Sequence, residues 1–251
     1  MRVYKLGGPA LEDPGLVGPL AREVSTGPEP AVIVHGGGRH VERMLRALAI
    51  ESKFVDGRRE TTAAAMEVVE MVLSGSVNKA IVAGLVAQGV PAIGISGRDA
   101  GLIQATPVAG LGCVGQPSQV NADVLHALLS RGFVPVVSPV SLGPGGTALN
   151  VNADEAALAL ASALRARSLV FFSDVDGVRV GAQAVPSLDA ATVRELIADG
   201  TITAGMAMKV QSALEAVAAG VPDVWVAGKA RLLGGFAGTR ITSSPDAGAR
   251  A

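Results

Sequence analysis

Two lysines stand where the sequence could act on a negatively charged substrate. Lysine accounts for only five of the 21 basic residues. Lys5 precedes the glycines Gly7 and Gly8, and Lys209 lies near the start of an apolar helical pattern. A lysine near the N-terminus of a helix opposes the helix dipole, and a bound anion would offset that cost. These two positions therefore indicate chemistry on an anionic group.

Glycine-rich turns follow several apolar segments that read as strands. The turns are Lys5-Leu6-Gly7-Gly8, His35-Gly36-Gly37-Gly38, Ser96-Gly97 and Ser173-Asp174-Val175-Asp176-Gly177. Glycine lets the backbone come close to an anion, and the N–H groups that open a following helix can donate hydrogen bonds to it. Because ligands bind beyond the carboxyl ends of parallel strands, several such turns predict a phosphate-binding edge of the sheet.

The segment Asn150-Val151-Asn152-Ala153-Asp154 opens a predicted helix with three polar side chains. An amide or a carboxylate commonly caps a helix at this point, and capping alone is one interpretation. One cap needs only one such residue, so three alternating polar side chains favour an additional role.

Other motifs with enzymatic associations fail on their context. Gly110-Leu111-Gly112-Cys113-Val114-Gly115 fits the dinucleotide-binding pattern, but it does not join a strand to a helix, so we expect a glycine-rich hairpin there. The sequence has no P-loop pattern, and Gly94-Ile95-Ser96-Gly97-Arg98 lacks the last glycine of a nucleophile elbow. P-loop and esterase chemistry are therefore excluded.

The elements that must position these residues alternate between short apolar runs and longer helical patterns, which predicts an α/β fold with a parallel sheet. Predicted strands lie at 3–4, 31–34, 91–95, 133–138, 168–172 and 224–227. Predicted helices lie at 39–50, 62–73, 78–88, 121–131, 154–165, 190–199 and 206–219. We expect two hairpins, at 52–60 and 102–116.

Composition bounds the class of protein. The chain has 251 residues, of which 49% are hydrophobic and 17% charged, with a net charge of −1. This predicts a folded chain with a large core and no nucleic-acid surface. The single cysteine, Cys113, and the lack of a long apolar run predict a cytoplasmic protein with no membrane partner. Residues 243–251 are small and polar and are expected to be a disordered tail.

Together these motifs resemble those of N-acetylglutamate kinases in the amino acid kinase family, over residues 2–242. The resemblance also rests on Gly57-Arg58-Arg59, on 70–79, on Ser96-Gly97-Arg98-Asp99 and on Gly205-Met206-Ala207-Met208-Lys209-Val210. It implies a three-layer α/β/α open sandwich around a mostly parallel central sheet. The resemblance further implies one domain over 1–242, with an amino-acid-binding and dimerising lobe at about 1–166 and an ATP-binding lobe at about 167–242.

The implied activity is phosphorylation of the γ-carboxylate of N-acetyl-L-glutamate by ATP, to give N-acetyl-L-glutamyl 5-phosphate in arginine biosynthesis. Mg²⁺ is implied only as an ion carried by ATP, with no metal held by the protein. The resemblance implies that Lys5 and Lys209 stabilise the transferring phosphoryl group and that Asp154 positions both lysines.

The resemblance also implies two sets of binding residues. The acyl-amino-acid contacts are Gly37, Gly38, Arg59 and Asn150. The nucleotide contacts are Gly7, Gly8, Ser173, Asp174, Val175, Asp176, Gly177, Val178, Arg179, Thr201, Ile202 and Thr203. Arg58 stands where the family commonly has an apolar residue, so the choice of Arg59 depends on its spacing from Gly57.

Two other functions are open on the same residues. One is a kinase for α-aminoadipate attached to a carrier protein in lysine biosynthesis, and the other is an amino-acid sensor without catalysis. Because the first strand is expected to begin at Arg2, with no helix before it, the resemblance predicts a homodimer without feedback inhibition by arginine.

Overall fold

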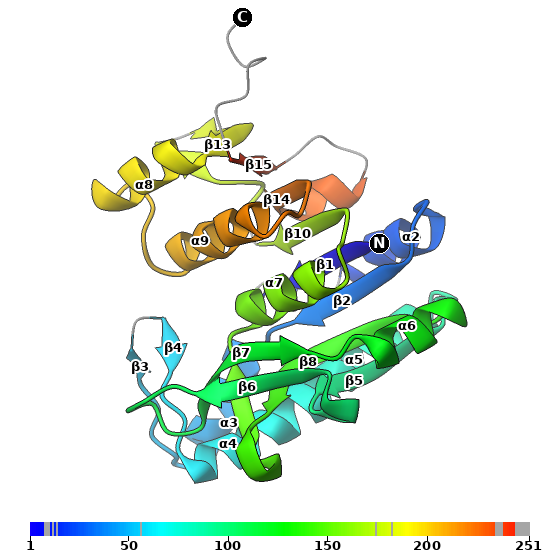
Figure 1. Cartoon of the computed structure of the whole chain (residues 1–251), viewed down its shortest axis with the longest axis vertical. Helices are drawn as coiled ribbons and strands as arrows, with labels where there is room; N and C mark the ends of the chain where they lie inside the picture. The colour runs from blue at the N-terminus through cyan, green and yellow to red at the C-terminus, as the bar shows by residue number, and fades with distance from the viewer. Residues whose placement is uncertain are drawn as a thin grey trace, which may run out of the picture.

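The computed structural model describes residues 1–7, 11, 13, 15–55, 57–173, 175–181, 183–233 and 238–243. Within them, one sheet of eleven strands has the order β13-β15-β14-β10-β1-β2-β8-β6-β7-β9, with β5 beside β8 (Figure 1). Its strands are β1 (Arg2–Leu6), β2 (Ala31–His35), β5 (Ala92–Gly97), β6 (Ile103–Pro107), β7 (Val114–Val120), β8 (Val134–Leu142), β9 (Ala148–Val151), β10 (Ser168–Phe172), β13 (Ser187–Asp189), β14 (Asp223–Ala227) and β15 (Thr239–Thr242). Two small hairpins lie outside it: β3 (Phe54–Val55) with β4 (Arg58–Arg59), and β11 (Arg179–Val180) with β12 (Gln183–Ala184).

The centre of the large sheet is parallel. β14, β10, β1, β2 and β8 follow one another in parallel pairs, and β5 continues this arrangement from β8. Antiparallel pairs occur between β6 and β7, β8 and β9, and β14 and β15. The central strands β1, β2 and β10 are buried along nearly their whole length on both faces, as strands between two layers of helices are. The predicted α/β class is confirmed, with a mixed sheet whose centre is parallel.

Helices pack on both faces of the sheet (Figure 1). One core contains side chains from α6 (Asp123–Ser130), α7 (Ala153–Ala163), α8 (Ala190–Ala198) and α9 (Ala204–Ala218). The other contains side chains from α2 (Val17–Thr26), α3 (Gly38–Ala47), α4 (Ala63–Glu70), the π-helix η1 (Met71–Val77) and α5 (Asn78–Val86). Consecutive strand residues alternate between the cores, so Val170 belongs to the second and Phe171 to the first.

The six predicted strands and seven predicted helices are all present, and so are both hairpins. The glycine motif at 110–115 lies at the turn between β6 and β7, so it is a hairpin as expected. Several elements were not expected: α2, β9, β13, β15 and the small hairpin of β11 and β12. The sequence of α2 has Gly18 and Pro19 in its first turn, where proline is tolerated, and this pair hides the helix from a pattern search. Three short 3₁₀-helices, η2 (Asp99–Gly101), η3 (Pro144–Gly146) and η4 (Lys229–Leu233), complete the described elements.

The two helices expected at 62–73 and 78–88 form one helical run, because the π-helix η1 joins α4 to α5. The whole run, Ala63–Val86, has 24 residues and is long and apolar enough to cross a membrane, judged by length and composition alone. The same run packs Val69, Leu73 and Leu85 into the core on one face of the sheet. Within η1, Ser74 Oγ lies 2.7 Å from Ser138 Oγ of β8, which ties the π-helix to the sheet.

A buried polar network around His35 lies where η1 meets α5. Asn78 Nδ2 donates to His35 Nε2 at 3.1 Å and to the Val136 carbonyl at 2.9 Å. His35 Nδ1 lies 2.7 Å from the Gly36 carbonyl, which assigns the ring proton to Nδ1. Lys79 Nζ contacts Asn78 Oδ1 at 3.1 Å and so fixes the orientation of the amide. Every polar atom of the neutral imidazole therefore has a partner, and protonation at Nε2 would set two donors against each other.

This network predicts an acid-sensitive free energy of unfolding. Burial lowers the pKa of His35 to about 4, outweighing the hydrogen bond to Gly36, and the charge of Lys79 lowers it further. The unfolded chain, with an ordinary histidine pKa near 6.5, binds this proton first, so stability is full above pH 6.5 and is lost as the pH falls toward 4. We expect a loss of about 2 kcal/mol between pH 7 and pH 5 from this residue alone, measured by urea unfolding.

The matched variants are His35→Asn and, for the exposed His126, His126→Asn. Only the first should flatten the fall in stability with acid. Equal pH dependence in His35→Asn and the unmodified protein would contradict the assignment.

Candidate active site

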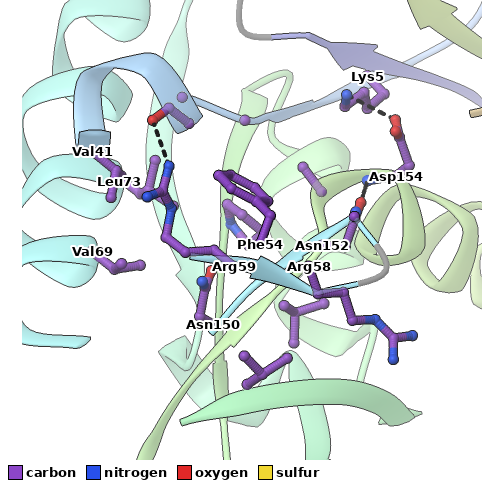
Figure 2. A pocket seen from close by; sticks show the side chains of 18 residues that line it. Lys5, Val41, Phe54, Arg58, Arg59, Val69, Leu73, Asn150, Asn152 and Asp154 are labelled. Carbon is purple, nitrogen blue, oxygen red and sulfur yellow. Dashed lines mark hydrogen bonds and ion pairs between the residues drawn. The ribbon is translucent and has the colours of Figure 1, made fainter. Parts of the chain in front are cut away.

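Three charged side chains from distant parts of the sequence meet at the carboxyl edge of the sheet. Lys5 Nζ lies 2.8 Å from Asp154 Oδ1 (Figure 2), and Lys209 Nζ lies 3.4 Å from each oxygen of the same carboxylate. The exposed fractions of Lys5, Asp154 and Lys209 are 6%, 7% and 8%. One carboxylate thus holds two ammonium groups in a nearly dry environment.

Each member of this cluster is positioned by the end of an element. Lys5 is the penultimate residue of β1, and Lys209 lies in the first half of α9, with its ammonium 5.8 Å from the centre of the Phe171 ring. Asp154 lies in the first turn of α7, where Asn152 is the N-cap and accepts a hydrogen bond from the Asp154 backbone N–H at 2.7 Å. The capping interpretation therefore applies to Asn152, and the Asp154 side chain remains for the lysines.

The charges of the cluster shift one another's pKa values. Burial opposes ionisation of Asp154, but the charges of Lys5 and Lys209 outweigh it, so the pKa of Asp154 falls below its usual value. Burial lowers the pKa of Lys209 to about 8, the neighbouring Lys5 charge lowers it further, and Asp154 opposes both effects. The cluster therefore carries a net positive charge near pH 7, with one lysine close to its titration point.

A cavity of about 220 Å³ opens beside Lys5 and Asp154 (Figure 2). All four residues predicted to contact the acyl-amino acid line it: Gly37, Gly38, Arg59 and Asn150. One wall is apolar and consists of Val41, Val69, Leu73 and Phe54. The cavity therefore offers an apolar surface, a guanidinium and an ammonium to one small molecule.

The guanidinium of Arg59 is held in a fixed orientation inside this cavity. Its Nη1 lies 2.5 Å from Glu42 Oε2 and 2.6 Å from Ser52 Oγ, and its Nη2 lies 3.3 Å from the Gly38 carbonyl. The ring of Phe54 lies 4.6 Å from the guanidinium carbon. A planar guanidinium offers five donors, and it suits a carboxylate because two parallel N–H groups can face the two oxygens.

The backbone around Gly37 leaves the cavity open at the start of α3. Gly37 has a φ of 148° and a β-carbon there would lie 2.7 Å from Leu73 Cδ2, so a side chain would both strain the turn and meet the apolar wall. Asn150 lies on β9, where its Nδ2 donates to Thr61 Oγ1 at 3.0 Å. Thr61 in turn donates to the Arg59 carbonyl, so β9 and β4 are linked through one hydroxyl.

Comparison with known proteins identifies the family to which this arrangement belongs. The chain matches the amino acid kinase family over residues 1–228. It is 43% identical over 245 residues to the acetylglutamate kinase of Chloroflexus aurantiacus, with 96% of each chain covered. It is 44% identical over 247 residues to that of Rubrobacter xylanophilus, covering 95% of this chain and 94% of the relative. The crystal structure of smu.665 from Streptococcus mutans superposes with a TM-score of 0.86 at 28% identity, covering 97% of this chain and 98% of that one.

The chain belongs to the amino acid kinase family. The resemblance inferred from the sequence is thereby confirmed. Members of this family are phosphotransferases, and phosphoryl transfer needs fixed positive charge.

Among the described residues, those predicted to contact the nucleotide do not line the cavity. The pairing of Leu6 with Phe172 places Gly7 beside Ser173, and Gly7 N–H donates to the Phe172 carbonyl at 3.2 Å. Gly8 and Asp174 lie outside the described residues. The following residues, Val175, Asp176, Gly177, Val178 and Arg179, run from β10 to β11, and Thr201, Ile202 and Thr203 precede α9. Their contact with a nucleotide stays a prediction.

Several residues of this site were missed in the sequence. Glu42 holds Arg59 from 17 positions away, and Glu155 pairs with Arg58 from 97 positions away. No local sequence pattern links either glutamate to its arginine, because each glutamate looks like an ordinary polar residue on the surface of a helix. Phe54 was the detectable one, because a phenylalanine in a polar hairpin is unusual in a chain with only 3% aromatics. Among the described residues, no three His, Cys, Asp or Glu side chains gather as a metal site.

The site predicts an unusually acidic amine at Lys209 in this amino acid kinase. Acetylation of Lys209 across a pH series, followed by mass spectrometry, should titrate near pH 8, with the exposed Lys53 as the internal reference for reactivity. The variant Asp154→Asn should move the Lys209 midpoint to lower pH, because it removes the charge that favours the ammonium. A midpoint near 10.5, or a rise in the variant, would contradict the cluster.

Proposed function

We propose that this chain transfers the γ-phosphoryl group of MgATP to the side-chain carboxylate of N-acetyl-L-glutamate, and so forms N-acetyl-L-glutamyl 5-phosphate in arginine biosynthesis. Relatives named acetylglutamate kinase, matched over nearly their whole length, support this substrate. The observation that carries the proposal is the Lys5–Asp154–Lys209 cluster beside a cavity that holds Arg59.

The acceptor needs no general base. A γ-carboxylate with a pKa near 4.3 is already ionised at neutral pH, so it can attack phosphorus directly. The difficulty is to bring this anion to an anionic triphosphate and to stabilise a loose transition state whose charge spreads over the phosphoryl oxygens. Catalysis then depends on alignment and on fixed positive charge.

Lys5 and Lys209 supply that charge in our proposal. They approach the phosphoryl group from β1 and from α9, and Asp154 holds both flexible side chains in one geometry. Because the cluster is buried, little water competes with its charges, and preorganised charge of this kind is usually the largest contribution to such catalysis. Lys209 must be protonated for this role, so the pKa near 8 sets an upper limit to the active pH range of the free protein.

The acceptor would lie in the cavity, with its α-carboxylate on Arg59. Glu42 and Ser52 hold the guanidinium in place, and the remaining donors are available to a ligand carboxylate. Gly37, Gly38 and Asn150 would contact the same molecule, and the apolar wall of the cavity would cover its apolar atoms.

The remaining expectations belong to this proposal. Gly7, the glycine after it, residues 173–179 and residues 201–203 would bind the nucleotide, with Mg²⁺ bound as part of that substrate. The molecule would work as the three-layer sandwich, with the acceptor lobe at about 1–166 and the nucleotide lobe at about 167–242. A homodimer and a cytoplasmic location stay predictions.

The direct test is an ADP-release assay with a panel of acceptors. We expect turnover with MgATP and N-acetyl-L-glutamate, and little with glutamate, aspartate or carrier-linked α-aminoadipate. The acetyl group distinguishes the preferred acceptor from glutamate and aspartate, and the absence of an attached carrier protein distinguishes it from the carrier-linked substrate. Preference for the carrier-linked substrate would overturn the proposal.

Replacing Arg59 tests the position of the acceptor. Arg59→Lys keeps the charge but loses the planar pair of donors, so we expect the KM for N-acetyl-L-glutamate to rise at least about tenfold, while the KM for ATP stays near its original value. Initial-rate kinetics with each substrate varied would measure both constants. An effect confined to ATP would show that Arg59 lies at the wrong end of the site.

A further inference from the structure

The β3–β4 hairpin sends two consecutive arginines to different partners. Arg59 turns toward Glu42, whereas Arg58 places Nη2 at 2.6 Å and Nε at 3.2 Å from Glu155 Oε1. Neighbouring residues of a strand point to opposite faces, so the short strand β4 separates the two guanidinium groups. Figure 2 shows the two side chains leaving the hairpin in opposite directions.

The β3–β4 hairpin makes two contacts with residues that lie next to the charged cluster in the sequence, one through Arg58 and one through Gly57. Glu155 directly follows Asp154 in α7. Gly57 packs against Met208, which directly precedes Lys209 in α9, and a β-carbon on Gly57 would collide with the Met208 sulfur. We call these two contacts, Arg58 with Glu155 and Gly57 with Met208, the hairpin clamp. The hairpin that carries Arg59 thus touches both helices that carry the cluster.

The ion pair in the clamp is well placed to hold this arrangement. The side chains of Arg58 and Glu155 are only 26% and 17% exposed. Glu155 Oε2 is buried and has no hydrogen-bond partner among the described residues, so the described hydrogen bonds of this carboxylate come from Arg58. Removing one partner of an ion pair costs more free energy when the remaining charge is partly buried than when it is exposed to water.

We propose that Arg58 is a positioning residue, which acts through Glu155 and the hairpin clamp to fix the distance between Arg59 and Lys209. This inference rests on the proposed function, which assigns Arg59 to the acceptor and Lys209 to the phosphoryl group. In-line transfer needs the two substrates aligned closely, and a misplacement of about 1 Å can reduce the rate about 100-fold. The hairpin clamp provides a direct contact between the hairpin that carries Arg59 and the helix that carries Lys209.

Kinetics of Arg58→Leu, Glu155→Gln and the double variant test the inference. We expect each single variant to lower kcat at least about tenfold with smaller changes in either KM, because alignment acts mainly in the transition state. The double variant should be no slower than Arg58→Leu, since the two residues act as one unit. Arg58→Lys, which keeps one charged contact, should recover most of kcat.

Arg240→Leu is the matched control. It removes an arginine from a partly exposed ion pair with Asp223, on β15 and β14, and should leave kcat within twofold of the original value. A purely structural role for Arg58 would instead lower the melting temperature of Arg58→Leu and of Glu155→Gln and leave their kcat unchanged. That result would overturn the inference.

The acetylation rate of Lys209 separates this inference from the proposed function, because it needs no turnover. Release of the hairpin from Met208 should expose Lys209, so its acetylation should speed up severalfold in Arg58→Leu and in Glu155→Gln, but not in Arg240→Leu. If the rate rises while the unmodified protein fails to phosphorylate N-acetyl-L-glutamate, the clamp stands and the proposed function fails. An unchanged rate in both clamp variants overturns the clamp.

Discussion

The ion pairs of Asp154 are the constraint on which the site depends. A buried carboxylate between two ammonium groups must be ionised, and its two partners must come close, or the charges would be left without compensation in a dry environment. Lys5 belongs to β1, Asp154 to α7 and Lys209 to α9, so this condition fixes one strand and two helices relative to one another. The excess positive charge that results is the property a phosphotransferase needs, and the unliganded fold must tolerate it.

The parallel centre of the sheet makes this meeting possible. β1 lies between β10 and β2 in register, so turns that are far apart in the sequence emerge at one edge. Asn152 satisfies the start of α7, which leaves Asp154 for the lysines. The proposed acceptor side is built differently, because Arg59 is carried on a two-residue strand and depends on side-chain partners for its orientation. One strand and two helices thus hold the charge cluster, and a small hairpin carries Arg59, the group we propose for carboxylate binding.

The sequence predicted most of the fold because glycine turns and apolar periodicity are local signals. It also singled out Lys5, Asp154 and Arg59, since each belongs to a motif of characteristic spacing, and the structure pairs the first two beside the cavity that Arg59 lines. It did not reveal α2, whose Gly-Pro start resembles a loop, or the π-helix that joins α4 to α5. Nor did it reveal the partners of the two adjacent arginines, because the choice between Glu42 and Glu155 is made by tertiary packing. Gly8 and Asp174 fall outside the described residues, and their role stays a prediction.

The π-helix also constrains how the length of this chain can vary. A π-turn contains more residues than an α-turn, so η1 sets the rotation of α5 relative to α4. Deleting one residue within Met71–Val77 would allow regular α-helical hydrogen bonds from α4 to α5. It would also rotate Asn78 by about 100° around the helix axis, away from His35. The glycine turn after β2 would then lose the neutral imidazole network beside it. Among sequences that keep this network, insertions and deletions in η1 should therefore be rarer than amino-acid replacements.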